Sequence, residues 1–425
     1  MPPRNVCRHT ATCYETSPYA PEAGYVQPSR KSRADAARPA KTKDRTSAAK
    51  LPDHSIFPPP LVPPGDDLAL DPEYPPQSFQ DWLEDEDRNE ITPDRKAIYI
   101  LAPPEIGEDI AFMQGWTAPR MQQGQLRLNE PSAEDIVEYL AAFYHGLPVK
   151  LLEIPDFRFV AWEEQKSKTV PRLVGLAVSD ECTGIRTRPC PDRLYPRQLN
   201  LDDLLDVAIS LLPQDAYALC LLVNHDLYED KDDTFVCGRA YGGSRVAVVS
   251  SARYCPALDD VQSVERGHAW PASHCMDYVQ SVCAAGSTAK KQKTIKKHGD
   301  NTTTPLRASM LTVRPRLNDS SNLSLLWLAR MCRTASHELG HCFGIDHCVY
   351  YACIMQGSAS LSEDARQPPY LCPVDLAKLL HATGATVREQ YMELIRYCSN
   401  GQRRNESFFD AFATWMRSTL NTMPG

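Results

Sequence analysis

Short apolar runs separated by polar segments mark the predicted strands of this chain. Four runs are bounded by charged residues, glycine or proline and have the length of buried strands: Ala97–Ala102, Val149–Ile154, Ala216–Asn224 and Arg245–Ser251. A charged turn and a Gly-rich segment separate the last two. Because predicted helices lie between several of these strands, the pattern indicates a mixed α/β lobe.

Longer segments carry apolar residues at helical spacing and begin at residues suited to capping. Ser132 is placed to cap a helix that ends at Gly146, and Asn200 to cap a helix over Leu201–Leu212. Apolar residues nearly surround the first half of a helix over Leu323–Phe343, which predicts a buried central helix. Three more helices are predicted at Pro373–Ala385, Val387–Tyr397 and Glu406–Leu420.

Two segments lack the composition of a packed core. Residues 1–75 contain many Pro, Ser, Ala, Lys and Arg residues, and Leu51–Pro64 is a proline-rich run that favours polyproline II or disorder. We therefore expect 1–75 to be a disordered Pro-rich N-terminal extension, with order beginning near Ser78. The Lys- and Thr-rich composition around 286–303 predicts a disordered insertion at about 285–315.

Composition restricts the partners and the compartment that we expect. The chain of 425 residues has 54 Asp and Glu against 46 Lys and Arg, so no basic field predicts nucleic-acid binding. No apolar stretch has the length of a transmembrane helix, and the N-terminus lacks the apolar core of a signal peptide. Fifteen cysteines, an odd number, then indicate reduced thiols. We expect no membrane partner and a cytoplasmic or nuclear location; the oligomeric state stays open.

One stretch, from His337 to His347, has the form H-E-x-x-H-x-x-G-x-x-H. On a helix, His337 and His341 are one turn apart and project from the same face, so both imidazoles can reach one metal ion. Glu338 points to an adjacent position, where a carboxylate can accept a proton from zinc-activated water without being a ligand. The pattern therefore predicts catalytic zinc chemistry.

The remaining positions of the motif supply a third ligand. Gly344 lets the chain leave the helix with a φ angle that other residues disfavour, and this brings back His347. Three protein ligands leave the fourth position to water, which is the arrangement of a catalytic zinc. The matches at Gly344 and His347 favour a metal site over histidines that only pack within a helix.

From Ser336 to Leu380 the chain resembles the archaemetzincins, a metzincin-type family of zinc peptidases. That family continues the long zinc motif into a cysteine, then C-x-M, then C-x-x-C, and the matching residues here are Cys348, Cys353, Met355 and Cys372. The resemblance implies that Met355 forms a turn beneath the metal. Weaker similarity makes 76–400 the expected catalytic domain. The residue pattern of Glu406–Leu420 makes 401–425 the expected C-terminal amphipathic helix.

The resemblance also implies the fold. We expect an α/β (α+β) metzincin-like zinc peptidase with a mixed twisted sheet, a central active-site helix, a Met-turn and a mainly helical C-terminal lobe. In such folds the last strand before the metal helix lies along the cleft with a free edge that can pair with extended substrate. By resemblance, Tyr241–Ser251 is the segment that we place there.

A second metal site is implied with one departure from the family. In the family four cysteines hold a structural zinc, whereas this chain has Asp375 at the fourth position. Zinc accepts carboxylate oxygen, so Cys348, Cys353, Cys372 and Asp375 can form a site. Alternatively, Asp375 is only a residue of a helix N-terminus stabilised by the helix dipole, and the second zinc is weak or absent. The three remaining thiolates favour a retained second zinc.

These observations predict a zinc-dependent metallopeptidase that hydrolyses a peptide or protein substrate with Glu338 as the general base. The resemblance favours a narrow or aminopeptidase-like preference. A catalytically weak or inactive zinc-stabilised interaction protein is one alternative; the intact Glu338 argues against it and the aspartate at 375 slightly for it. Zinc-dependent hydrolysis of other substrates is the second.

Overall fold

The structure is a computed structural model that describes residues 9, 11–39, 50–120, 128–162, 171–286, 304–312, 319–401, 403 and 407–423. The chain folds as two compact units. The first, called here the helical unit, comprises Met1–Glu86, Asp259–Leu317 and Ile345–Gly425. The second, called here the sheet unit, comprises Asp87–Leu258 and Asn318–Gly344.

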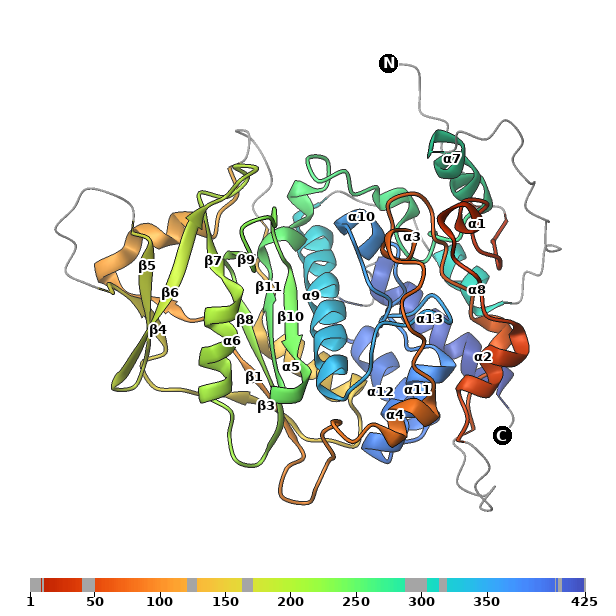
Figure 1. The fold of residues 1–425 in the computed structure, drawn as a ribbon, viewed down its shortest axis with the longest axis horizontal. Coiled ribbons are helices and arrows are strands. Elements are labelled where there is room, and N and C mark those ends of the chain that lie inside the picture. The colour runs from red at the N-terminus through yellow and green to blue at the C-terminus, as the bar shows by residue number, and fades with distance from the viewer. Residues whose placement is uncertain are drawn as a thin grey trace. The chain divides into compact units, whose positions relative to one another are not determined.

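The sheet unit is built on a five-stranded mixed sheet with the strand order β10-β11-β8-β1-β3 (Figure 1). β1, β3, β8 and β11 run parallel to one another, and β10 pairs antiparallel with β11. The strands are β1 (Ala97–Leu101), β3 (Val149–Leu152), β8 (Ala216–Val223), β10 (Gly238–Tyr241) and β11 (Val246–Ser250). All four strands predicted from the apolar runs are therefore confirmed.

Strand β8 is apolar at every position because both of its faces are covered. All its residues are buried. Leu219, Leu221 and Val223, which alternate along the strand, join the core cluster that contains the leucines of helix α6 (Leu201–Ser210). Figure 1 shows α6 on one side of this sheet and the long helix α9 (Ser320–Cys342) on the other. A strand enclosed in this way reads as a continuous apolar run.

The predicted helix starts in the sheet unit are confirmed at their capping side chains. Ser132 Oγ accepts a hydrogen bond from the Asp135 N–H at the start of α5 (Ala133–Phe143), over 3.1 Å. The Asn200 side chain accepts one from the Asp203 N–H at the start of α6, also over 3.1 Å. Each bond satisfies an N–H that has no partner within the helix, so the helix begins at that residue.

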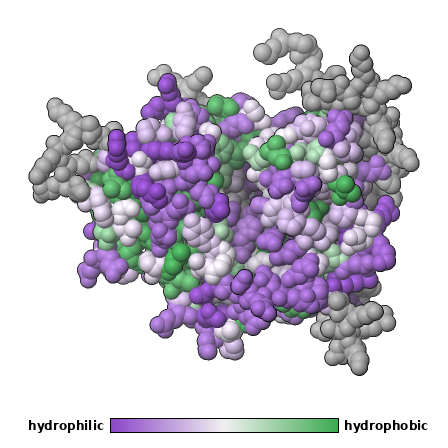
Figure 2. Space-filling model, viewed as in Figure 1, coloured by the Kyte–Doolittle hydropathy of each residue, from purple (hydrophilic) through white to green (hydrophobic). Residues whose placement is uncertain are grey.

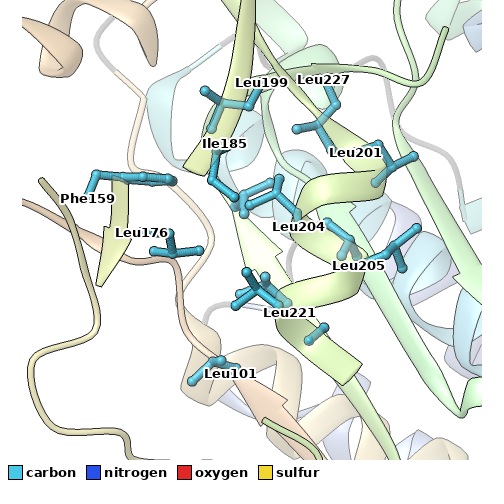
Figure 3. Close-up of a cluster of buried hydrophobic side chains, with 14 of the residues drawn as sticks. Leu101, Phe159, Leu176, Ile185, Leu199, Leu201, Leu204, Leu205, Leu221 and Leu227 are labelled. Carbon is cyan, nitrogen blue, oxygen red and sulfur yellow. The ribbon is translucent and has the colours of Figure 1, made fainter. Parts of the chain in front are cut away.

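A second sheet, with the order β2-β4-β5-β6-β7-β9, has no counterpart in the sequence predictions. Its longest strand, β6, buries only two of its residues, so it lacks a readable apolar run. Figure 3 shows side chains of this sheet, among them Phe159 and Ile185, packed with Leu204 of α6 and Leu221 of β8. The strands are β2 (Glu105–Ile106), β4 (Arg158–Val160), β5 (Leu173–Val178), β6 (Glu181–Pro189), β7 (Arg197–Asn200) and β9 (Asp226–Tyr228).

The prediction that Tyr241–Ser251 provides the free edge of the main sheet is wrong. The short 3-10 helix Gly242–Ser244 and Arg245, which has φ 63°, turn the chain back on itself. As a result β10 pairs with β11 and β11 lies between β8 and β10. Strand β10 therefore forms the edge.

The helical unit confirms the predicted helices after the metal motif. The segments predicted at Pro373–Ala385 and Val387–Tyr397 are helices α11 and α12, and the C-terminal amphipathic segment is α13. Together with the mixed sheet of the other unit, these helices confirm the predicted α/β fold with a mainly helical C-terminal part. The helices of this unit are α1 (Ala20–Ala23), α2 (Arg30–Ala36), α3 (Asp67–Leu70), α4 (Phe79–Glu84), α7 (Met276–Gly286), α8 (Pro305–Thr312), α10 (Leu361–Asp364), α11 (Pro373–Thr383), α12 (Val387–Cys398) and α13 (Ser407–Thr422).

The N-terminal segment differs from the predicted disorder wherever the structure describes it. Residues 11–39 and 50–75 contain α1, α2 and α3 and bury several apolar side chains. Val62, for example, is fully buried in a small cluster that includes Tyr25, Leu68 and Val349. A few apolar residues are enough here because each one packs against the rest of the helical unit, which composition alone cannot reveal.

The predicted insertion at about 285–315 falls mostly outside the described residues. Its described part includes helix α8, which packs against α13.

Figure 2 shows hydrophilic residues over most of the visible face, and the exposed large apolar side chains, such as Val26, Leu70 and Met392, are far apart in the sequence. Among the described residues, no helix combines the length and the apolar content that crossing a bilayer requires.

Replacing Leu204 by alanine is expected to destabilise the sheet unit, because this side chain is fully buried in the cluster of Figure 3. The cavity should lower the free energy of unfolding by about 2–5 kcal/mol. Ile209→Ala on the same helix removes a side chain that is 39% exposed and should cost less than half as much. Urea denaturation measures both, and equal losses would contradict this packing.

Candidate metal centres

Helix α9 places the first two histidines of the motif side by side. His337 and His341 are one turn apart, and the Nε2 atoms of the two rings lie 3.0 Å from each other. Two imidazole nitrogens at this separation both point toward the same small volume. A tetrahedral zinc with Zn–N bonds of about 2.0–2.1 Å separates its nitrogen ligands by about 3.3 Å, so the pair suits one ion.

The chain turns immediately after this helix to bring back the third histidine. The Gly344 N–H donates to the His341 carbonyl over 2.9 Å, and Gly344 has φ 71°, in the left-handed region. The candidate ligand atoms of His337, His341 and His347 all lie within 4.8 Å of one another. The structure thus brings together the three imidazoles of the motif.

Glu338 is buried between its own helix and the edge strand of the sheet. A Cβ atom on Gly238 of β10 would lie 3.3 Å from Glu338 Cγ and 3.4 Å from Oε1. Burial raises the pKa of the Glu338 carboxyl to about 8, and the positive charge of Arg239 partly opposes this rise. The sequence predicted a role for Glu338 but not the close approach of Gly238.

Contacts within the sheet unit fix the end of α9 that carries the motif. The Tyr144 hydroxyl donates to the Ser336 carbonyl over 2.7 Å, and the Tyr217 hydroxyl donates to the Cys342 carbonyl over 3.2 Å. A Cβ atom on Gly242 would lie only 2.6 Å from the His341 carbonyl oxygen, so the turn after β10 needs a glycine there. The two histidines therefore project from a rigid element.

A second cluster lies in the helical unit. Cys348, Cys353, Cys372 and Asp375 are all buried, and their ligand atoms lie within 4.8 Å of one another. The sulfurs of Cys348 and Cys372 are 3.6 Å apart, far beyond the bond length of a disulfide. Zn–S bonds of about 2.3 Å in a tetrahedral site separate sulfurs by about 3.8 Å, so the spacing suits a metal.

The surroundings of Cys348 favour the thiolate, which is the form that binds metal. Burial acts to raise the pKa of its thiol, but hydrogen bonds from the neighbouring thiols and from the backbone at Tyr350 and Tyr351 outweigh it and lower the pKa. These backbone groups belong to the turn directly after Cys348. The turn thus stabilises negative charge on its first residue.

Asp375 directs one carboxylate oxygen at the cysteines and the other at a lysine. Its Oδ2 lies 3.4 Å from Cys353 Sγ and 3.3 Å from Cys372 Sγ, while Oδ1 accepts a hydrogen bond from Lys378 Nζ over 3.0 Å. Burial raises the pKa of Asp375 to about 7, with Lys378 opposing. Asp375 also lies in the first turn of α11, so both interpretations considered from the sequence apply to its position.

Lys378 is a buried cation that the sequence analysis missed. Its Nζ donates to Asp375 Oδ1, to the Gln77 carbonyl over 2.9 Å and to Gln77 Oε1 over 2.7 Å, which accounts for all three ammonium hydrogens. Gln77 Oε1 also accepts the Asp346 N–H over 3.1 Å. One short network therefore joins the second cluster to the backbone next to His347.

His347 lies among residues from the N-terminal segment. The ring centroid of Tyr74 is 5.7 Å from that of His347. Burial lowers the pKa of His347 and so favours the neutral imidazole, while the carboxylates of Asp67 and Asp346 oppose this shift. Asp67 and Tyr74 fall in the region predicted to be disordered, so no sequence signal connected them with the motif.

Met355 belongs to the turn that follows His347. Its side chain is fully buried, and its carbonyl accepts a hydrogen bond from the Cys348 N–H over 2.8 Å. This bond closes the loop that contains Cys348 and Cys353. The main chain at Met355 thus helps to hold the residue directly after the third histidine.

Comparison with known proteins finds similarity over the part of the chain that contains both clusters. Residues 307–380, which include all seven candidate ligands, match Peptidase family M54. The chain is 28% identical over 334 residues to Archaemetzincin-2 of Macaca fascicularis, and 27% identical over 334 residues to Archaemetzincin-2 of Homo sapiens. Each alignment covers 79% of this chain and 72% of the relative.

A solved structure is also similar in part. The crystal structure of archaemetzincin from Methanopyrus kandleri matches with 16% sequence identity and a TM-score of 0.32. The match covers 69% of this chain and 98% of that chain.

Lys378→Met is expected to destabilise the helical unit strongly, because it leaves the buried carboxylate of Asp375 without its cation. Both side chains are almost fully buried, and breaking a buried pair costs about 3–5 kcal/mol. Lys150→Met is the control: its 4.0 Å pair with Asp215 is about half exposed, and its loss should cost less than about 1 kcal/mol. Denaturation of the variants without bound zinc measures both losses, and equally small losses would refute this.

Proposed function

We propose that this chain, which belongs to the archaemetzincin family of zinc metallopeptidases, hydrolyses peptide bonds with His337, His341 and His347 as zinc ligands and Glu338 as the general base. The convergence of the three imidazole nitrogens next to a buried glutamate is the observation that carries the proposal. Neutral histidine nitrogens and an open fourth position are the donor set of a catalytic zinc.

Glu338 would carry the proton during hydrolysis, beside the bound zinc. A bound zinc activates water and polarises the scissile carbonyl. The Glu338 carboxylate accepts a proton as the water oxygen attacks the carbonyl carbon, and it then delivers this proton to the nitrogen that leaves when the C–N bond breaks. Glu338 suits this shuttle because burial raises its pKa toward neutral pH, where a carboxyl group can both accept and release a proton.

Strand β10 is the element that we propose for binding extended substrate. It has one neighbour in its sheet, β11, so its other edge can offer main-chain hydrogen bonds to a peptide. Gly238 of this strand lies against Glu338, which would place a paired peptide beside the base. An aminopeptidase-like preference is the narrower form of this proposal and rests on the family resemblance.

We propose that Cys348, Cys353, Cys372 and Asp375 hold a second, structural zinc. Asp375 Oδ2 would be the fourth donor, because it faces the sulfurs of Cys353 and Cys372. Lys378 would keep Oδ1 away from the metal by donating a hydrogen bond to it. Three thiolates and one carboxylate carry the same formal charge as four thiolates, so the substitution at 375 preserves the charge balance of the site.

A reducing compartment such as the cytoplasm or nucleus follows as a further part of the proposal. No disulfide joins any two cysteines in the described part of the chain. Thiolate ligands stay available to zinc only where they are kept reduced.

Glu338→Gln is expected to lower kcat/KM for peptide hydrolysis by about 10²–10⁴-fold while zinc content stays unchanged, because only the proton acceptor is lost. His341→Ala should lose both the activity and one zinc. Mass spectrometry of a mixed peptide library, with elemental analysis of each variant, measures both and separates N-terminal trimming from internal cleavage. A zinc-replete protein that cleaves no peptide would favour the non-catalytic interaction protein instead.

Elemental analysis of the unmutated protein is expected to give two zinc atoms per chain, falling to one in Cys353→Ala. Asp375→Cys should retain two, because it restores a fourth thiolate. Cys220→Ala removes a buried cysteine of β8 that is outside both clusters, and it should also retain two. A single zinc in the unmutated protein would rule out the second site.

A further inference from the structure

Asp67 and His347 share a small space beside Gly357. A Cβ atom on Gly357 would lie 2.1 Å from Asp67 Oδ2 and 2.9 Å from His347 Nδ1. Both polar atoms therefore lie close to the same point, and only a residue without a side chain leaves room for them. The three residues come from the helical unit, and Asp67 is supplied by the N-terminal segment.

The backbone around Asp67 is held firmly in this position. The Asp67 N–H donates to Glu363 Oε2 over 2.9 Å, and the same oxygen accepts the Ala359 N–H over 2.8 Å. The preceding residue, Asp66, pairs with Arg366 through two hydrogen bonds of 2.5 and 3.1 Å, and both side chains are largely buried. A bidentate pair of this kind fixes geometry as well as charge.

The other carboxylate close to His347 is arranged differently. Asp346 is the adjacent residue in the chain, but it is exposed, and its N–H donates a hydrogen bond to Gln77 Oε1. Asp67 is the carboxylate whose oxygen shares the Gly357 space with the imidazole Nδ1. Asp67 and Asp346 carry the same charge near the His347 imidazole, so they differ mainly in where their carboxylates lie relative to Nδ1.

A histidine that binds metal through Nε2 carries its proton on Nδ1, and that N–H needs an acceptor. A carboxylate in this place selects the tautomer, orients the ring and raises the basicity of the ligand nitrogen. We propose that Asp67 is a positioning residue of the three-histidine site: its Oδ2 accepts a hydrogen bond from His347 Nδ1, which leaves Nε2 to the metal. This inference rests on the proposed zinc site and assigns the N-terminal segment a part in it.

The test measures zinc affinity in the full-length protein by dialysis against graded chelator concentrations, with zinc counted per chain. Zinc release from the three-histidine site is the step that is missing in His341→Ala. Asp67→Ala should lower the zinc affinity of this site by about 10–100-fold. Asp67→Asn, which keeps an acceptor oxygen of the same shape, should lower that affinity less. Asp346→Asn is the matched control and should leave it unchanged.

A nitrogen-resolved NMR measurement of His347 in the zinc-loaded protein gives a readout that a merely structural role would not move. The Nδ1–H signal should be protected from exchange in the unmutated protein and lose that protection in Asp67→Ala. Unchanged zinc affinity in Asp67→Ala, with affinity lost in His347→Ala, would refute the role of Asp67 alone. If His347→Ala keeps the affinity of the unmutated protein, the three-histidine site itself fails. Should Asp67→Ala not fold, the isosteric Asp67→Asn and the crowding variant Gly357→Ala decide the question.

Discussion

The peptide bond between His347 and Cys348 is the constraint on which both candidate metal centres depend. His347 belongs to one cluster and Cys348, the next residue, belongs to the other, so the backbone at this bond has to position a ligand for each. The loop that follows must then return two more ligands, and the hydrogen bond from the Cys348 N–H to the Met355 carbonyl closes it. A metal held by Cys348, Cys353 and their partners would therefore stiffen the backbone that carries the third histidine.

Several buried charges in the two units are paired with opposite charges. Lys378 forms an ion pair with Asp375, and Arg366 forms one with Asp66, each within the helical unit. In the sheet unit, Arg253 is almost fully buried and pairs with Asp226 and Asp192. Such pairs add little net stability relative to apolar residues, but removing one partner is costly. They therefore help to specify where the elements that carry them must lie.

A small number of contacts orders the N-terminal segment, although its composition is Pro-rich and poor in apolar residues. Val62 and Tyr25 pack beside Val349, and the Tyr25 hydroxyl donates to the Val349 carbonyl over 2.7 Å. Val349 follows His347 and Cys348 directly, so the segment contacts the loop between Cys348 and Cys353. The position of Asp67 is a consequence of this packing and of the Asp66–Arg366 pair.

The sequence by itself determined the features that depend on local spacing. Local geometry of a helix or strand fixes features that involve residues close together in the chain. These features are the two histidines one helical turn apart, the glycine with positive φ, the cysteine series and the main strands and helices. Only the tertiary structure decided which distant residues meet them: Asp67 at His347, Gln77 at Lys378, Gly238 at Glu338. It also decided that β10 forms the sheet edge. These contacts join segments with no periodic relation to each other, so they depend on how the whole chain packs, which no local pattern records.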